Sequence, residues 1–106
     1  MKQYLLILKG KKELDYSPQE LQKRLEEYRK WVSTLSDKYV QDNRLERSGA
    51  HIKSEDNVVM DGPFLESKEI IGGFIIIKST NLSDAVALAK TSPLLQYFEI
   101  YVRPIV

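Results

Sequence analysis

The sequence contains no cysteine and a single histidine, His51. Without cysteine, disulfides, thiolate nucleophiles and thiolate metal sites are excluded. One histidine is too few for a histidine-rich metal centre. From this composition we expect neither a bound metal nor a cofactor.

The chain also lacks an excess of charge of either sign. Lysine and arginine number 16 and the acidic residues 15, which gives a net charge of +1. Nucleic-acid and membrane-surface binders usually carry a basic excess, so we expect neither as a partner. The apolar run at residues 4–8 is too short for a signal-peptide core or a membrane span, and we expect a cytoplasmic protein.

The length and composition suit one globular domain over residues 1–106, because 42% of the residues are hydrophobic. Residues 2–8 form an apolar run without alternation, which predicts a strand buried on both faces. A helix is predicted from Ser17, because serine caps it, proline follows at the first helical position and Glu20 completes a capping box. Its predicted apolar stripe is long: Leu21, Leu25, Tyr28, Val32, Leu35 and Tyr39. Trp31, beside this stripe, is predicted to cover the edge of the core.

The second half of the chain predicts several strands and one helix. We expect a short strand around 44–46, a turn at 48–49, a brief edge strand at 51–54 and a strand at 57–60 running into a turn at Asp61. Residues 70–78 are rich in β-branched and aromatic residues and form the clearest strand. A second helix begins after Asn81 and ends before Pro93.

The last predicted strand, residues 97–103, alternates cleanly between its two faces. Three apolar side chains face one way: Phe98, Ile100 and Val102. Four polar or aromatic side chains face the other: Tyr97, Glu99, Tyr101 and Arg103.

This order predicts an α+β fold of the ferredoxin-like βαββαβ type, with a mainly antiparallel sheet and a small extra strand in the middle. Right-handed crossovers would place both helices on one side of the sheet. The other face would then expose leucine and isoleucine, which soluble monomers avoid. We therefore expect a homodimer, with two copies packed face to face.

The most informative segment runs from Asp61 to Phe74. Asp61-Gly62-Pro63-Phe64 has the chemistry of a tight turn, and Glu66, Lys68 and Glu69 follow at once. The pair Gly72-Gly73 then opens an apolar strand, which predicts a bulge or a close approach of a ligand, a partner subunit or the long helix, with the structural alternatives favoured. No nucleotide-binding pattern surrounds the two glycines.

This segment resembles the signature of the YCII-related family, also called the DGPF-domain family. The resemblance extends over nearly the whole chain, including the starts of both helices and the ending Val102-Arg103-Pro104-Ile105. It implies a ferredoxin-like protomer in the dimeric α/β-barrel superfamily. Some relatives have an early histidine and an aspartate placed as an acid–base pair, and this chain has no histidine before His51. Residues 95–98 are also bulkier than the glycines that many relatives have there.

The candidate site residues each have a structural alternative. Asp61 is either a general base or polar anchor, or simply the residue that holds its own turn, and the second is favoured. Glu66, Lys68 and Glu69 either bind a polar ligand or form a solvated or intersubunit charge cluster. The lone His51 is expected to be an exposed histidine without a special role.

The outward row of the last strand completes the candidate site. Arg103, with Tyr101 beside it, either clamps a carboxylate or pairs with a glutamate at an interface. Asp61 and Lys68 are the candidate catalytic residues, and Asp61, Glu66, Lys68, Tyr101 and Arg103 the candidate ligand-binding residues.

Two functions remain in view. One is a dimeric protein that binds a small polar molecule in a cleft between sheet and helices near the Asp61 segment, with or without catalysis. The other is a non-catalytic dimeric module for interaction or regulation. The family resemblance implies a link between this second function and transcription, because bacterial relatives are often associated with transcription-initiation factors.

Overall fold

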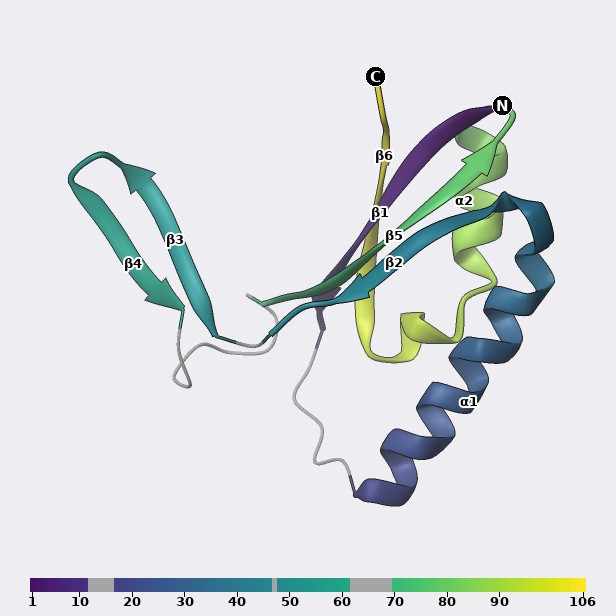
Figure 1. Ribbon diagram of the computed structural model, residues 1–106, viewed down its shortest axis with the longest axis horizontal. Helices are drawn as coiled ribbons and strands as arrows, with labels where there is room; N and C mark the ends of the chain where they lie inside the picture. Colours follow the sequence, from purple (N-terminus) through teal and green to yellow (C-terminus); the bar gives the residue numbers. More distant parts are fainter. Residues whose placement is uncertain (12–16, 47, 62–69) are drawn as a thin grey trace.

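The computed structural model spans residues 1–106 and describes residues 1–11, 17–46, 48–61 and 70–106 (Figure 1). The elements follow in the order β1 (Lys2–Gly10), α1 (Pro18–Leu35), β2 (Tyr39–Arg44), β3 (Gly49–Ser54), β4 (Asn57–Asp61), β5 (Ile71–Ser79), α2 (Leu82–Lys90) and β6 (Phe98–Pro104). Short 3₁₀ turns occupy Ser36–Lys38 and Pro93–Gln96. None of the described helices is both long and apolar enough to cross a membrane.

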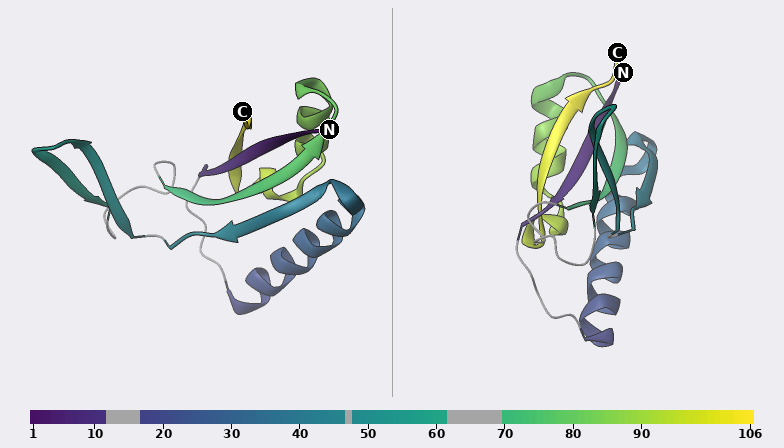
Figure 2. Two further views of the ribbon diagram at one scale, coloured as in Figure 1. Left: turned by 45° about the horizontal axis from the view of Figure 1, so that its top comes forward. Right: turned by 90° about the vertical axis from the view of Figure 1, so that its left-hand side faces the viewer.

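Four strands form the main sheet in the spatial order β2-β5-β1-β6, with every neighbouring pair antiparallel. Both helices lie on the same face of this sheet (Figures 1 and 2). With β3 and β4 set aside, the order is that of a ferredoxin-like fold, and the predicted α+β class is confirmed. We call the other side of the main sheet the open face.

Strands β3 and β4 form a separate two-stranded antiparallel sheet between β2 and β5 in the chain. The strands predicted at 51–54 and 57–60 are therefore present, but they pair with each other as a hairpin. The strand predicted around 44–46 is wrong in its bounds, because β2 covers Tyr39–Arg44. The turn predicted at 48–49 is also misplaced, since Gly49 begins β3.

Helix α1 begins as predicted and ends earlier. The Ser17 hydroxyl accepts a hydrogen bond from the Glu20 backbone N–H at 3.1 Å, which caps the first turn. The helix stops at Leu35, because Ser36 takes a positive φ of 54° that reverses the chain. Tyr39, assigned to the helical stripe by its spacing, lies in β2 instead.

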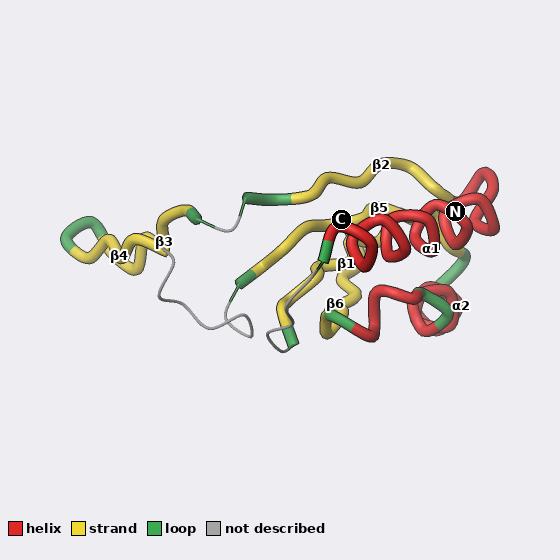
Figure 3. The backbone as a smooth tube through the Cα atoms, turned by 90° about the horizontal axis from the view of Figure 1, so that it is seen from below, coloured by secondary structure: helices red, strands yellow, loops and turns green. Residues whose placement is uncertain are grey.

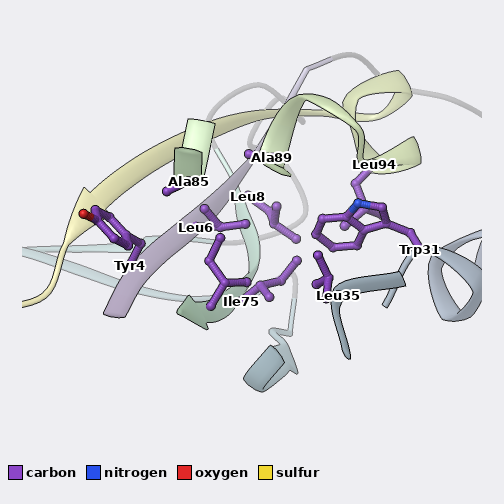
Figure 4. Packing of buried hydrophobic residues seen from close by; sticks show 10 residues of the cluster. Tyr4, Leu6, Leu8, Trp31, Leu35, Ile75, Ala85, Ala89 and Leu94 are labelled. Carbon is purple, nitrogen blue, oxygen red and sulfur yellow. The ribbon is translucent and has the colours of Figure 1, made fainter. Parts of the chain in front are cut away.

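The core fills the space between the helices and the main sheet (Figure 4). Its buried side chains are Tyr4, Leu6, Leu8, Trp31, Leu35, Ile75, Ile77, Ala85, Ala89 and Leu94. Leu21 and Leu25 of the predicted stripe are 41% exposed, while Trp31 is buried and its Nε1–H donates to the Thr91 hydroxyl at 2.8 Å. Trp31 therefore joins α1 to the end of α2.

The glycine pair produces a bulge, as one of its predicted alternatives proposed. Leu8 and Lys9 are consecutive in β1, but their partners on β5 are Gly73 and Ile71, so Gly72 is the extra residue. A Cβ atom at Gly73 would lie 2.8 Å from the Asn43 carbonyl oxygen, and one at Gly72 would lie 2.8 Å from a ring carbon of Phe98. Neighbouring parts of this chain are what approach the two glycines.

Candidate functional site

The open face carries two rows of side chains that cross all four strands of the main sheet. Residues paired across antiparallel strands share a face, so the register defines each row. One row is Arg103, Leu5, Ile76 and Gln41; the other is Tyr101, Ile7, Phe74 and Asn43. The middle of the face is therefore apolar, with an arginine and a tyrosine along one side and two amides along the other.

The apolar side chains of these rows are half-buried by their neighbours within a single chain, and Tyr101 is 43% exposed. The core-facing residues of the same strands, such as Leu6 and Ile75, are almost fully buried. Residues 2–8 were predicted to form a strand buried on both faces. Leu6 and Leu8 are buried on the helix side, whereas Leu5 and Ile7 on the open face are only half-buried within one chain. The open face thus offers an accessible apolar floor bordered by hydrogen-bonding groups.

Tyr101 and Arg103 lie together at the β6 side of the open face, as their alternation predicted. They are two positions apart on one strand face, which separates their Cα atoms by about 6–7 Å. Phe98, Ile100 and Val102 turn the other way and pack against the core, also as predicted. An arginine fork beside a phenol can hold a carboxylate or an ionised hydroxyl of a ring-shaped molecule.

Tyr97 was predicted to belong to the same outward row, and this placement is wrong. Strand β6 begins only at Phe98. The Arg24 guanidinium of α1 lies 4.4 Å from the centroid of the Tyr97 ring and 4.9 Å from that of Phe98. Tyr97 is therefore held on the helix side by a cation–π contact.

The acidic and basic candidates from the Asp61 segment lie largely outside the described residues. Asp61 is the last residue of β4, opposite Gly49, and its side chain is not described. Glu66 and Lys68 fall within residues 62–69, which are not described. The chain is described again from Ile70, whose carbonyl accepts a hydrogen bond from the Gly10 N–H at 2.8 Å.

The register shows how far the described end of this segment lies from Arg103. Ile71 pairs with Lys9, whereas Arg103 pairs with Leu5, four residues earlier in β1. Four strand positions correspond to about 13 Å along the sheet. The structure therefore brings Tyr101 and Arg103 together and places the start of β5 four strand positions along the sheet from Arg103.

Sequence reasoning missed Asp42, which joins β2 to α1 on the helix side of the sheet. Its carboxylate accepts a hydrogen bond from the Tyr28 hydroxyl and another, at 2.7 Å, from the Tyr39 hydroxyl. Burial, followed by the hydrogen bond to Asp42, raises the pKa of Tyr28 far above its ordinary value. The hydrogen bond to Asp42 also raises the pKa of Tyr39. Both phenols therefore stay protonated as donors, which suits a structural clamp better than proton transfer.

His51 lies exposed on β3, opposite Val59. Among the described residues, no group of three or more carboxylate or imidazole side chains is arranged to hold a metal ion. The space between sheet and helices, where the sequence suggested a cleft, is packed with core side chains (Figure 4). The open face is thus the better candidate surface.

Comparison with known proteins agrees with this architecture. A family model for the YCII-related domain matches residues 3–106. The chain belongs to the YCII-related family. The YCII-related fold is also supported by a solved structure, 5-chloro-2-hydroxyhydroquinone dehydrochlorinase from Burkholderia phenoliruptrix in complex with 2,5-dihydroxybenzoquinone. The TM-score is 0.56 at 16% identity, covering 98% of this chain and 93% of that one. No curated protein matches the sequence.

At 16% identity, the likeness to the dehydrochlorinase establishes a shared fold. The match over residues 3–106 is what establishes membership of the YCII-related family. The sequence-based assignment to this family, made from the first strand, the starts of both helices, the Asp61 segment and the chain's ending, is confirmed.

Proposed function

We propose that this YCII-related protein binds a small polar molecule with a flat ring on the open face of its main sheet. The observation that carries the proposal is the pair of cross-strand rows, which set an apolar floor between Tyr101 and Arg103 on one side and two amides on the other. Ligand sites generally combine an apolar lining with a few polar groups that fix orientation. A ring would lie on Leu5 and Ile7, and Arg103 would hold its acidic substituent.

The structural neighbour gives the proposal a chemical class. That protein is a dehydrochlorinase captured with 2,5-dihydroxybenzoquinone, a flat ring bearing hydroxyl and carbonyl oxygens. A hydroxylated or carboxylated aromatic ring suits a site with an arginine and a phenol at its edge. For catalysis, Asp61 and Lys68 remain our candidates, with Glu66 as a further polar contact, all from the segment that leads into β5.

The same proposal includes a homodimer closed over the open face. Half-buried leucine, isoleucine and phenylalanine side chains there form the kind of contiguous apolar surface that soluble monomers rarely expose. A second copy would cover this surface and enclose the ligand between two sheets. Light scattering in dilute solution should give twice the mass of the chain, and a monomeric mass would contradict this part of the proposal.

A charge on the open face provides the matched test of the dimer. Leu5→Asp should give a folded monomer, because Leu5 lies on the open face rather than in the core. Leu21→Asp, at an exposed leucine of α1, serves as the control and should remain dimeric. Circular dichroism checks that both variants fold.

Ligand binding is tested by titrating ¹⁵N-labelled protein with 2,5-dihydroxybenzoquinone and, separately, with benzoate. Backbone amide shifts should concentrate on the two rows of the open face. Arg103→Ala should weaken binding roughly 10- to 100-fold, as expected for one lost hydrogen bond between charged groups. Arg29→Ala, on the exposed side of α1, should leave binding unchanged. If neither probe shifts these amides at millimolar concentration, the proposal fails.

The alternative, a non-catalytic module for interaction or regulation, is favoured by a different observation. The β3–β4 hairpin exposes several large apolar side chains away from the main sheet. A protein partner could cover them. A pull-down from cell extract that finds no stoichiometric partner would count against this alternative.

A further inference from the structure

The β3–β4 hairpin projects from the molecule on the side of the open face. In the right-hand view of Figure 2 it stands in front of the main sheet, while α2 lies behind that sheet. Figures 1 and 3 show it at the opposite end of the molecule from the helices. Every side chain of β3 is exposed. The hairpin therefore lies on the open-face side of the main sheet, away from the helices.

One face of this hairpin is apolar. The register pairs Ile52 with Val58 and Ala50 with Met60, so these four side chains share a face. Ile52 is 70% exposed, Val58 52% and Met60 72%. An isolated two-stranded hairpin is at best marginally stable in water, and it needs a further packing surface. Within a single chain, the β3–β4 hairpin therefore lacks the packing surface that would stabilise it.

The chain is more extended than a compact domain of its length. The radius of gyration is 15.1 Å, whereas a compact domain of this length has about 13 Å. The accessible surface is 7630 Å², against about 6,100 Å² expected for a folded monomer of 12.3 kDa. The chain as a whole thus exposes about 1,500 Å² more surface than a compact monomer of its mass.

Charge favours a second copy of this chain as the occupant. The turn of the hairpin carries two exposed carboxylates, Glu55 and Asp56. The open face carries three cationic residues and one carboxylate: Lys9, Lys78, Arg103 and Glu99. Acidic and basic surfaces attract, and each surface also brings an apolar patch to the other. One chain thus carries both the acidic hairpin and the basic open face, which are complementary to each other.

We propose that the hairpin is an arm that packs against a second copy of the chain and closes that copy's site on the open face. The inference rests on the proposed function for the identity of the site. With the two open faces turned toward each other, each arm extends from its own open-face side toward the partner. A two-fold axis makes the exchange reciprocal, so each site gains a wall from the other subunit.

The absence of native cysteine allows a direct test by paramagnetic broadening. An Asp56→Cys variant without ¹⁵N carries a nitroxide label at the hairpin turn. It is mixed with ¹⁵N-labelled protein of the parent sequence, and the two are left to exchange subunits. The observed chain carries no nitroxide, so any broadening comes from another copy. We expect at least a twofold loss of signal for open-face amides such as those of Leu5, Phe74 and Tyr101. Broadening absent from the open face overturns the proposal.

A matched pair of substitutions provides a second measurement. Ile52→Asp on the apolar face of the arm should weaken the dimer at least 10-fold in sedimentation. His51→Asp, one residue before Ile52 in the regular part of β3 and therefore on the other face, is the control and should weaken it less than threefold. Both positions are exposed, so neither change touches the core. Equal dimer affinity in the two variants would contradict the proposal.

The outcomes separate the arm from the ligand site. A dimer that shows broadening from the arm but binds neither 2,5-dihydroxybenzoquinone nor benzoate supports the arm and removes the proposed function. If the protein binds a probe through Arg103 yet stays monomeric at millimolar concentration, the proposed function stands and the proposed role of the arm is wrong. A monomer whose hairpin binds a different protein or a lipid vesicle also overturns the choice of occupant.

Discussion

Replacing Tyr28 with phenylalanine should destabilise the fold by removing one of the two hydrogen bonds that hold Asp42. The Tyr28 hydroxyl of α1 donates to the Asp42 carboxylate of β2, and Tyr39 donates to its other oxygen. A hydrogen bond to a charged group contributes about 1.5–3 kcal/mol, and Tyr28 is only half-buried, so we expect a loss of about 1.5 kcal/mol. Tyr39→Phe should cost a similar amount, because Tyr39 is also half-buried and donates to the same carboxylate.

The assay is urea unfolding followed by tryptophan fluorescence, since Trp31 is the single tryptophan and is buried in the core. A double-mutant cycle with Asp42→Asn isolates the coupling between Tyr28 and Asp42. Unfolding is to be measured at several protein concentrations, because a dimer would make the apparent stability depend on concentration. A Tyr28→Phe variant within about 0.3 kcal/mol of the parent would refute the reasoning.

The same contact predicts how stability depends on alkaline pH. Burial and the Asp42 carboxylate raise the pKa of Tyr28 far above the ordinary tyrosine value. In the unfolded chain tyrosine ionises near pH 10, so the contribution of Tyr28 is complete below about pH 10 and declines as the pH rises above it. The slope for one group is about 1.4 kcal/mol per pH unit. The stability gap between the parent and Tyr28→Phe should therefore shrink above pH 10. A gap that stays constant from pH 9 to 11 would contradict the assigned shift.

Two further predictions concern packing. Gly73→Ala should cost about 1–3 kcal/mol in unfolding free energy, because its Cβ would lie 2.8 Å from the Asn43 carbonyl oxygen, while Gly49→Ala has open space and should stay within about 0.5 kcal/mol. Thr91→Val should cost about 1–2 kcal/mol by leaving the buried indole N–H of the tryptophan without its acceptor, whereas Thr80→Val, at an exposed bend, should be nearly neutral in the same assay.

The elements whose patterns are local were predictable from the sequence. The Ser17 cap, the alternation in β6 and the β-branched run in β5 each depend on neighbours a few residues apart. These patterns also placed Tyr101 and Arg103 on the face away from the helices. The fold class followed from the order of such elements.

The features that depend on backbone reversals or long-range register were not predictable in the same way. Tyr39 continues the four-residue spacing after Leu35, and a serine with positive φ leaves no pattern in the sequence to end the helix. Similarly, two short strands predict a hairpin but not whether it joins the main sheet. The meeting of Tyr28 with Asp42 requires α1 and β2 to be docked first.

The order β2-β5-β1-β6 leaves two strands, β2 and β6, at the rims of the sheet. Rims of this kind invite further strands to add, and proteins resist such growth with irregular backbone, charge and proline. Here the register slips between Tyr39 and Gln41 in β2, and β6 carries Glu99, Arg103 and a terminal Pro104. These features discourage the addition of further strands at either edge of the sheet, and with it growth into fibrils.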